Sequence, residues 1–383
     1  MKRKTFIVPQ TVLPQQEKQW FDPACPEFAP SEEARRWWID LDNPDNPFSK
    51  FIGNEKAVKR LCRAAFTALE RHNRCCRDQS FALLGPASTG KTTLAKMFAE
   101  LIDLPFVEIN PRSILSLDDI LFAIASVMEN TPIQRADDLP ATLELVPDDQ
   151  GLIIVPPCIV FIDEVHSLRN NIVQGLLKAT EKSDNKLIVE GGWVVDCKNI
   201  CWHIATTDRG SLFDAFDTRF NKVNLRLYSR QEIAMIVKIN HPDWSDETCE
   251  LVARYAGHVP REALAFASEM QLEYNLNGGD WDEIASTIAD DNEIDEYGMT
   301  YQRRKILVAL HHQPISRNRM ATVAGCKEEE LEKFVMPPLL AETPDRPALV
   351  EVSTRGYRLT EEGQLEVRKY VKPEPNRLGN ILN

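Results

Sequence analysis

The first part of the chain alternates short apolar runs with amphipathic stretches. Runs of strand length occur at 81–84, 106–109, 158–162 and 200–205. The runs are mostly apolar, and the one at 158–162 is uninterrupted, which is typical of a strand buried on both faces of a parallel sheet. Between and around them, apolar residues recur at helical spacing, at 55–71, 91–102, 118–128 and 171–181. This alternation predicts an α/β domain whose parallel sheet is covered by helices on both faces.

The pattern changes after residue 228. Helical spacing continues to 290 without a strand-like run. After residue 298, three helical segments at 303–311, 317–324 and 327–336 precede a strand at 348–352. The turn Ser353-Thr354-Arg355-Gly356 then leads into a second arm at 357–360. Helices followed by a small hairpin predict a winged-helix module.

Three further segments interrupt or flank this pattern. Two β-rich arms around Gly-Gly at 186–196 predict a hairpin. The stretch 129–157 is rich in Asp and Pro and is interpreted as an insertion. The expected organisation is an irregular arm at 1–45, an α/β domain at 46–227, a helical domain at 228–295, a winged-helix domain at 296–372 and a tail at 373–383.

Charge is distributed unevenly along the chain. The 383 residues carry a net charge of −13, but residues 296–383 contain 14 Lys and Arg against 12 Asp and Glu. The preceding residues contain 31 Lys and Arg against 46 Asp and Glu. Because net charge governs non-specific attraction to nucleic acid, any contact with DNA is expected from a local patch in the C-terminal domain.

Neither targeting nor membrane features appear in the pattern. No segment approaches 18 uninterrupted apolar residues, and the apolar stretch near the N-terminus stops at Pro9. Nine cysteines fall at irregular spacings with no C-x-x-C pair. We therefore expect a cytoplasmic protein with reduced thiols and no membrane association.

A complete G-x-x-x-x-G-K-[ST] motif joins the first apolar run to the following helix. Glycines let successive backbone N–H groups turn toward one point, where the helix also directs its positive dipole. The lysine of this motif reaches the β- and γ-phosphates, and its final hydroxyl ligates Mg²⁺. The motif predicts binding of ATP with Mg²⁺ by Gly85, Pro86, Ala87, Ser88, Thr89, Gly90, Lys91 and Thr92.

An acidic pair follows the apolar run at 158–162. At the carboxyl edge of a parallel sheet, where ligands of α/β folds bind, Asp163 is positioned to hold Mg²⁺ together with Thr92. Glu164 is positioned to polarise the attacking water. The pair favours a hydrolase over a protein that only binds nucleotide.

The order of the motifs resembles that of the AAA+ ATPase family, and within it the RuvB motors that drive Holliday-junction branch migration. After the phosphate loop come Phe161-Ile162-Asp163-Glu164-Val165-His166, Ala205-Thr206-Thr207, Asp217-Thr218-Arg219-Phe220 and Gly257-His258-Val259-Pro260-Arg261. The likeness covers roughly residues 51–360. It implies an AAA+ P-loop NTPase fold: an α/β parallel-sheet core, a helical lid and a C-terminal winged helix.

The resemblance also implies roles for individual residues. Thr207 is expected to sense the γ-phosphate, and Arg219 to act as an arginine finger in the site of a neighbouring subunit. Arg261 is expected to couple the lid to the nucleotide. The remaining expected nucleotide contacts are Ile52 and Gly53 at the adenine, with Thr93 and Tyr228.

A finger supplied in trans implies a ring, hexameric by resemblance. DNA is expected at Arg355 and Arg358 of the wing, where the flanking arginines of the family are missing. Asp217 likewise replaces the first arginine of the finger box. The 186–196 hairpin, the 129–157 insertion or the N-terminal arm is expected to contact a RuvA-like or other protein partner.

The expected function is that of a RuvB-like, helicase-like motor for DNA recombination and repair, which uses ATP to translocate or branch-migrate DNA. Two alternatives remain open at this point. One is a clamp-loader-like or remodelling ATPase that acts on a protein bound to DNA. The other is an ATP-gated regulatory switch in defence or transposition.

Overall fold

The computed structural model contains two compact units. It describes residues 41–70, 79–102, 104–129, 133–134, 140–141, 152–155, 157–181, 185–189, 194–207, 216 and 218–371. The first unit holds the described residues up to Gly85 and from Gly90 to Leu225. The second unit holds Pro86–Thr89 and the described residues from Arg226 onward. Residues 1–40 of the expected arm, the Gly-Gly turn of the hairpin, Asp217 and the expected tail lie outside the described residues.

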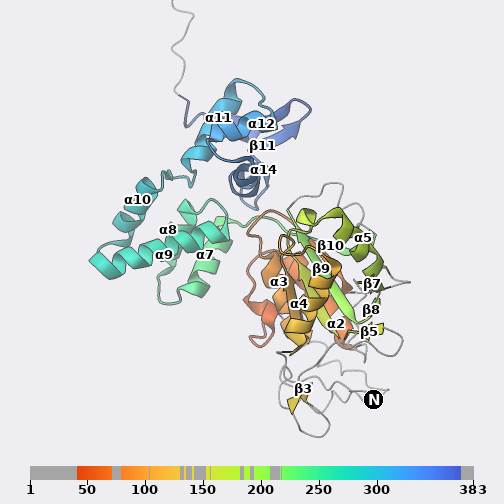
Figure 1. Cartoon of the computed structure of the whole chain (residues 1–383). Coiled ribbons are helices and arrows are strands. Elements are labelled where there is room, and N and C mark those ends of the chain that lie inside the picture. Colours follow the sequence, from red (N-terminus) through yellow and green to blue (C-terminus); the bar gives the residue numbers. More distant parts are fainter. Residues whose placement is uncertain are drawn as a thin grey trace, which may run out of the picture. The chain divides into compact units, whose positions relative to one another are not determined.

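A five-stranded parallel sheet forms the centre of the first unit (Figure 1). Its spatial order is β10-β1-β9-β6-β2, so chain order and spatial order differ. The strands are β1 (Phe81–Leu84), β2 (Phe106–Ile109), β6 (Cys158–Ile162), β9 (Ile200–Thr206) and β10 (Asn221–Asn224). Strands β1, β6 and β9 are buried along their whole length, as their apolar sequences predicted.

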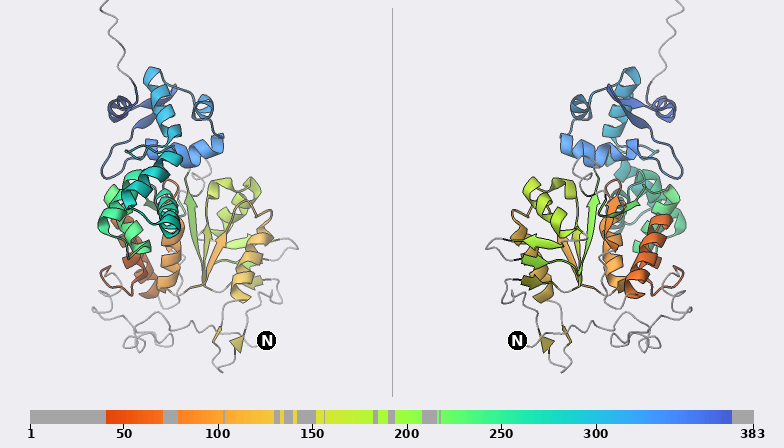
Figure 2. Two further views of the ribbon diagram at one scale, coloured as in Figure 1. Left: turned by 90° about the vertical axis from the view of Figure 1, so that its left-hand side faces the viewer. Right: turned by 90° about the vertical axis from the view of Figure 1, so that its right-hand side faces the viewer.

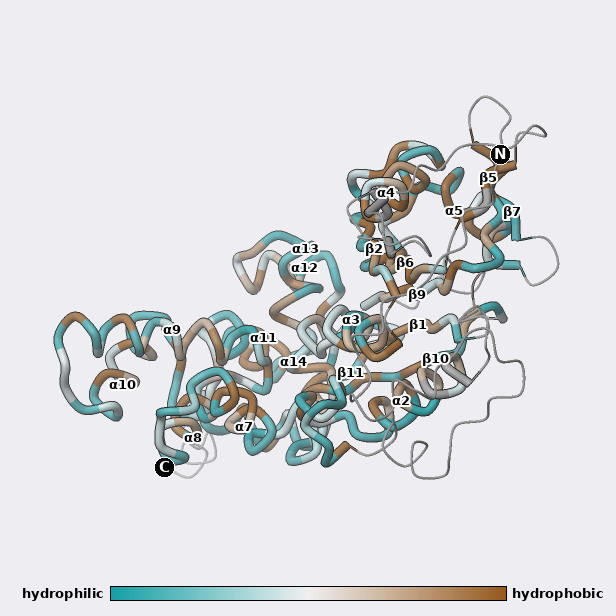
Figure 3. Tube along the Cα trace, turned by 90° about the horizontal axis from the view of Figure 1, so that it is seen from below, coloured by the Kyte–Doolittle hydropathy of each residue, from teal (hydrophilic) through white to brown (hydrophobic). Residues whose placement is uncertain are grey.

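Helices cover both faces of this sheet (Figure 2). On one face, α2 (Glu55–Glu70) and α3 (Lys91–Ile102) form one hydrophobic core with the strands. On the other face, α4 (Leu117–Glu129) and α5 (Asn170–Ala179) form a second core. The hydrophobic colour follows the central strands in Figure 3. The predicted α/β architecture with two covered faces is confirmed.

The edge strand β10 corrects one sequence-based expectation, in which 200–205 was the last core strand. Its sequence, Asn221-Lys222-Val223-Asn224, is mostly polar, and only Val223 is buried. Such a pattern carries no signal of a strand buried on both faces. The strand nevertheless pairs with β1 in parallel, because a strand at the edge of a sheet needs only one buried face and one hydrogen-bonded neighbouring strand.

A second small sheet corrects the interpretation of 129–157 as a loop-like insertion. Strands β7 (Lys186–Ile188) and β8 (Val194–Asp196) pair antiparallel, as the hairpin prediction required. Strand β5 (Leu152–Ile154), from within the presumed loop, pairs parallel with β8. The short strands β3 (Ile133–Gln134) and β4 (Pro140–Ala141) form a further ladder in the same stretch.

The second unit begins with a helical part around its own hydrophobic core. It contains α7 (Arg230–Asn240), α8 (Asp246–Tyr255), α9 (Pro260–Asn277) and α10 (Trp281–Asp291). A capping box between Ser229 and Glu232 fixes the start of α7. The lid is thus entirely helical over its described residues, as predicted.

The C-terminal module has a separate core. Its helices are α11 (Tyr301–His312), α12 (Arg317–Ala324), α13 (Glu328–Glu330) with the π-helical turn η6 (Leu331–Val335), α14 (Pro337–Leu340) and α15 (Glu361–Val367). The hairpin of β11 (Val350–Ser353) and β12 (Gly356–Leu359) is the expected wing. Gly356 has φ 112°, and a Cβ there would lie 2.3 Å from the Ile315 carbonyl oxygen. Helix α15 was not anticipated from the sequence.

Among the helices in the described part of the chain, none has both the length and the apolarity that a membrane crossing demands.

Burial of His203 in β9 predicts a dependence of stability on pH. Its ring packs edge-on against Phe81 and Phe98, and burial lowers its pKa to about 4. In the unfolded chain the His203 imidazole binds a proton near pH 6.5, whereas in the folded chain it does so only near pH 4. Stability conferred by the neutral imidazole is therefore complete above pH 6.5 and decreases as pH falls toward 4, by at most about 1.4 kcal/mol per pH unit.

His203→Phe should remove this contribution while keeping an aromatic ring in the core. Urea unfolding measured between pH 4 and pH 7 should show a shallower decline in the free energy of unfolding for the variant. His312→Phe, at the exposed end of α11, is the matched control and should keep the wild-type slope. Equal slopes for wild type and His203→Phe would contradict the assignment.

Candidate nucleotide site

The phosphate loop begins where β1 ends. Gly85 lies so close to Leu225, the residue directly after β10, that an added Cβ would come within 2.6 Å of the Leu225 carbonyl oxygen. Ser88 and Gly90 adopt positive φ values of 62° and 85°, and α3 starts at Lys91. Left-handed residues before a helix N-terminus turn backbone N–H groups into an anion-binding concavity. The loop therefore fits a polyphosphate.

The side chains of the loop are held in place from within. Lys91 is only 6% exposed, and its ammonium donates to the Gly85 carbonyl oxygen over 2.9 Å. The Thr89 hydroxyl donates to the Pro86 carbonyl oxygen over 2.9 Å. The backbone carbonyl of Thr89 accepts a 3.0 Å hydrogen bond from the Tyr228 hydroxyl, so this tyrosine braces the loop.

Asp163 follows β6 directly and faces the phosphate loop. Its Oδ2 accepts a hydrogen bond from the Thr92 hydroxyl at 3.3 Å, and its Oδ1 accepts one from the Glu164 amide at 3.0 Å. Burial raises the pKa of Asp163, and the Lys91 ammonium lowers it again in part. A hydroxyl and a carboxylate held side by side are hard oxygen ligands of the kind that Mg²⁺ prefers.

No group of three or more His, Cys, Asp or Glu residues in the described part of the chain forms a complete metal cage. Mg²⁺ does not need such a cage, since it is usually held by one or two carboxylates together with waters and substrate phosphates. The Thr92 and Asp163 pair therefore fits Mg²⁺ bound with a nucleotide.

Glu164 is held in an unusual conformation. Its φ of 49° lies in the left-handed region, which is uncommon for a residue with a side chain. Its Oε2 accepts hydrogen bonds from the Thr207 hydroxyl at 2.9 Å and from the Thr207 amide at 3.4 Å. Such outliers persist where the surroundings fix them and occur often at active sites. The carboxylate is thus fixed at the sheet edge beside Asp163.

Two residues beyond the expected set complete this cluster. His166 Nδ1 lies 2.8 Å from the Thr206 hydroxyl oxygen and 3.2 Å from Glu164 Oε2. The sequence placed His166 in the acidic box but gave it no role. No spacing of residue types in the sequence indicates this contact, because it depends on the register between β6 and β9.

The other expected nucleotide contacts lie in separate places. Ile52 and Gly53 form the turn before α2, where Gly53 has φ 70°. Thr93 is exposed on α3, and Arg219 is half-buried shortly before β10. Tyr228 and Arg261 belong to the second unit, Tyr228 buried and Arg261 exposed at the start of α9. The contacts described above bring only Tyr228 of this group to the phosphate loop.

The two arginines that are expected to contact DNA differ in their surroundings. Arg355 is exposed at the turn between β11 and β12, and no ion pair among the described residues includes it. Arg358 Nε lies 2.7 Å from Glu351 Oε1 of the opposite strand. Glu351 and Arg358 are register partners in the hairpin, so this ion pair follows from the strand pairing.

Comparisons with known proteins agree with this geometry. The model of the ATPase family associated with various cellular activities (AAA) matches residues 81–230. The Holliday junction branch migration complex subunit RuvB of Campylobacter jejuni subsp. doylei is 26% identical over 321 residues, covering 78% of this chain and 84% of the relative. The RuvB of Bdellovibrio bacteriovorus is 25% identical over 353 residues, covering 88% and 95%.

Among solved structures, the Thermotoga maritima RuvB Holliday junction branch migration motor aligns with a TM-score of 0.63 at 22% identity. The alignment covers 87% of this chain and all of that one. The chain thus has the AAA+ P-loop fold and is similar to RuvB in sequence over most of its length, as the motifs indicated.

Glu164→Gln tests the chemistry of the site. The amide keeps the shape of the side chain but does not accept a proton from the attacking water. We expect Mg²⁺-dependent ATP binding to persist, while ATP turnover falls at least about 100-fold. Calorimetric ATP titration and phosphate release measure the two quantities separately. Glu108→Gln on β2, a carboxylate of the same sheet that pairs with Lys96, is the matched control and should hydrolyse ATP normally. Rapid hydrolysis by Glu164→Gln would contradict the role of Glu164 as the base.

Proposed function

We propose that this chain is a RuvB-like, ring-forming ATPase that uses ATP hydrolysis to translocate or branch-migrate DNA. The observation that carries the proposal is the cluster of Lys91, Thr92 and Asp163 with Glu164 held by Thr207. This cluster lies in a chain that is similar to RuvB over most of its length.

Each residue of the cluster has a distinct task in hydrolysis. The loop N–H groups and the Lys91 ammonium bind the β- and γ-phosphates and offset the charge that develops there. Thr92 and Asp163 hold Mg²⁺, which neutralises phosphate charge. The Glu164 carboxylate accepts the proton of the attacking water. Thr207 orients that carboxylate through its 2.9 Å hydrogen bond and is well placed to respond to the γ-phosphate.

The ring follows from the proposed use of Arg219. This half-buried residue lies between Phe216 and β10, a segment in which Phe216 and Phe220 pack edge-to-face. Its backbone N–H donates to the Phe216 carbonyl oxygen over 2.9 Å, which closes a turn. In a ring, the Arg219 guanidinium on this turn supplies positive charge to the ATP site of the neighbouring subunit.

Mixing two inactive variants tests this arrangement. Arg219→Ala lacks the finger, and Lys91→Ala lacks the phosphate-binding ammonium, so each protein alone should lose nearly all turnover. Mixed rings contain interfaces with Lys91 on one side and Arg219 on the other, and they should regain part of the activity. The matched control mixes Arg219→Ala with the double variant that carries both Arg219→Ala and Lys91→Ala. Because neither protein has Arg219, no interface in this mixture combines Lys91 with Arg219. Absence of recovery in rings shown to be mixed would contradict a finger in trans.

The C-terminal module supports binding to the DNA backbone rather than reading of base sequence. In a helix-turn-helix, the second helix presents its N-terminal residues to base edges. Here that helix, α13 with η6, begins with Glu328-Glu329-Glu330, all exposed. Carboxylates at this position repel phosphates. The hairpin turn with Arg355 is therefore the proposed DNA contact, supported by the basic balance of residues 296–383.

The two hairpin arginines should contribute unequally to DNA binding. Arg355→Ala should weaken duplex binding about equally across sequences and lower the salt slope by roughly one unit. Arg358→Ala should have a smaller effect, because Glu351 already neutralises part of that charge. Fluorescence anisotropy with two unrelated duplexes and a four-way junction, over a range of salt, measures both quantities. The double variant Glu351→Gln with Arg358→Ala removes both members of the ion pair. Comparing it with Arg358→Ala alone separates the effect of losing the ion pair from the effect of losing the arginine charge.

A second function is favoured by the charge of the lid. Residues 241–296 contain 15 Asp and Glu against two Arg and no Lys, a balance that repels DNA and attracts basic proteins. A remodelling ATPase acting on a protein bound to DNA would use such a surface. Unchanged DNA affinity and salt slope in Arg355→Ala would favour this function over the translocase.

A further inference from the structure

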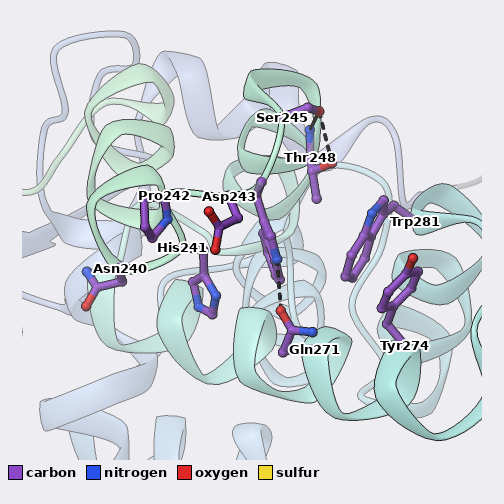
Figure 4. A pocket seen from close by; sticks show the side chains of 10 residues that line it. Asn240, His241, Pro242, Asp243, Ser245, Thr248, Gln271, Tyr274 and Trp281 are labelled. Atoms are coloured by element: carbon purple, nitrogen blue, oxygen red, sulfur yellow. Dashed lines mark hydrogen bonds between the residues drawn. The ribbon is translucent and has the colours of Figure 1, made fainter.

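A pocket of about 550 Å³ lies in the lid, at the junction of α7, α8, α9 and α10 (Figure 4). Its volume falls in the range of small-ligand sites. Side chains from all four helices or their connections line it, among them His241, Asp243, Trp244, Gln271, Tyr274 and Trp281. None of these residues takes part in the nucleotide cluster described above.

Four aromatic rings form a continuous row along the pocket. His241 stacks on Trp244 with ring centroids 4.2 Å apart, and Trp244 meets Trp281 at 4.9 Å. Trp281 stacks on Tyr274 at 4.4 Å, with the ring planes 16° apart. The row runs from the end of α7 to α9 and the first residue of α10. Because neighbouring rings cover one another's faces, the row presents ring edges and the outer faces of its end members to the cavity.

The row has a fixed base and an open rim. Trp244 is 7% exposed, and its indole N–H donates to Gln271 Oε1 over 2.9 Å. Tyr274 is 41% exposed. An aromatic ring left in water at the rim of a pocket forms an apolar patch of the kind that marks interaction sites. The exposed Leu272 and Leu276 lie two positions before and after Tyr274, on the opposite side of α9. The base holds the geometry, and the rim is accessible to a ligand.

Negative charge surrounds this apolar patch. Asp243 lines the pocket and is exposed. At the start of α10, Asp280 precedes Trp281 in the sequence, Asp282 and Glu283 follow it, and all three carboxylates are exposed. One basic side chain reaches a pocket residue: the Lys238 ammonium donates to the Trp244 carbonyl oxygen, and Asp246 Oδ1, 3.3 Å from the same ammonium, offsets its charge. The excess of acidic residues over the whole lid makes the local potential negative.

Aromatic rings and negative charge together select the chemistry of the ligand. A nucleobase stacks on aromatic rings, but its phosphates are repelled by surrounding carboxylates. A cationic side chain is attracted both by the faces of Trp and Tyr and by the carboxylates. Arginine suits the site best, because its planar guanidinium stacks on rings and pairs with a carboxylate in the same pose. Lysine offers a compact charge without the stacking plane.

We propose that this aromatic pocket binds an arginine side chain presented by a basic segment of a partner protein. Tyr274, exposed at the rim and backed by Trp281, provides the stacking surface, and Asp243 of the same pocket pairs with the guanidinium. The pocket thus gives the lid a docking surface for a protein, independent of the nucleotide site and of the DNA contact.

Titration of the full chain with capped Gly-Arg-Gly-Arg-Gly peptide tests the proposal, with binding measured by calorimetry. Matched peptides carry citrulline, a neutral analogue of arginine, or lysine. We expect saturable binding of the arginine peptide, at least about tenfold weaker binding of the citrulline peptide and intermediate binding of the lysine peptide. Tyr274→Leu should weaken binding of the arginine peptide about three- to tenfold, whereas Tyr274→Phe should retain it.

Charge variants separate the pocket from general attraction to an acidic lid. Asp243→Asn should weaken the arginine peptide about threefold, whereas Glu250→Gln, an exposed carboxylate on α8 that does not line the pocket, should not. Equal binding of arginine and citrulline peptides, or equal losses in the two charge variants, would overturn the proposal. A change of oligomeric state in Tyr274→Leu with unaltered peptide binding would also overturn the proposal, since the pocket would then be occupied by a second copy of this chain. Thermal unfolding of each variant confirms that the lid is intact.

Discussion

The parallel pairing of β1, β9 and β6 is the constraint on which the nucleotide site depends. Leu84 pairs with Thr206, and Ile162 pairs with Ile204, so the three strands end at nearly the same level. Parallel strands expose their carboxyl ends at one edge, where ligands of α/β folds bind. The phosphate loop, the acidic pair and Thr207 therefore meet although long segments separate them in sequence. A register shift by one residue would turn every side chain of the shifted strand to the opposite face, and the hydrogen bond between Glu164 and Thr207 would be lost.

Polar contacts continue from the phosphate loop through the second unit to the C-terminal module. The Tyr228 hydroxyl donates to Thr89, and the Tyr228 carbonyl accepts from His258 Nδ1 at 2.9 Å. His258 Nδ1 also lies 3.6 Å from Asp345 Oδ1, and burial lowers the pKa of His258 to about 4, so the imidazole donates as a neutral ring. A bidentate pair between Glu262 and Arg303, which is 3% exposed, joins the residue after Arg261 to α11. Breaking such a buried pair on one side is costly. The first set of contacts connects Thr89 of the loop to Asp345 of the C-terminal module, and the Glu262–Arg303 pair is a second link between the lid and that module.

Sequence patterns predicted the features that depend on local periodicity and on motif spacing. The three inner strands, the edge strand β2 and the helices that cover them follow from apolar runs and helical spacing, and the phosphate loop follows from its motif and flanks. Strand β10 was missed because only Val223 is buried in it. The contact of His166 with Thr206 and the ion pair of Arg358 with Glu351 depend on strand register and rotamers. Neither quantity is encoded in the spacing of residue types, so these partners become apparent only in three dimensions.

Charge divides the second unit into surfaces with different ligand preferences. The lid is strongly acidic, whereas residues 296–383 are slightly basic. Within the C-terminal module itself, the acidic start of α13 leaves the β11–β12 turn as the more favourable side for a polyanion. Phosphate contacts of this kind position a duplex without reading its sequence, which suits the proposed movement along DNA of any sequence. The acidic lid repels such a duplex and attracts basic proteins, so the proposed DNA contact and the proposed protein-docking pocket belong to parts of the unit with opposite charge.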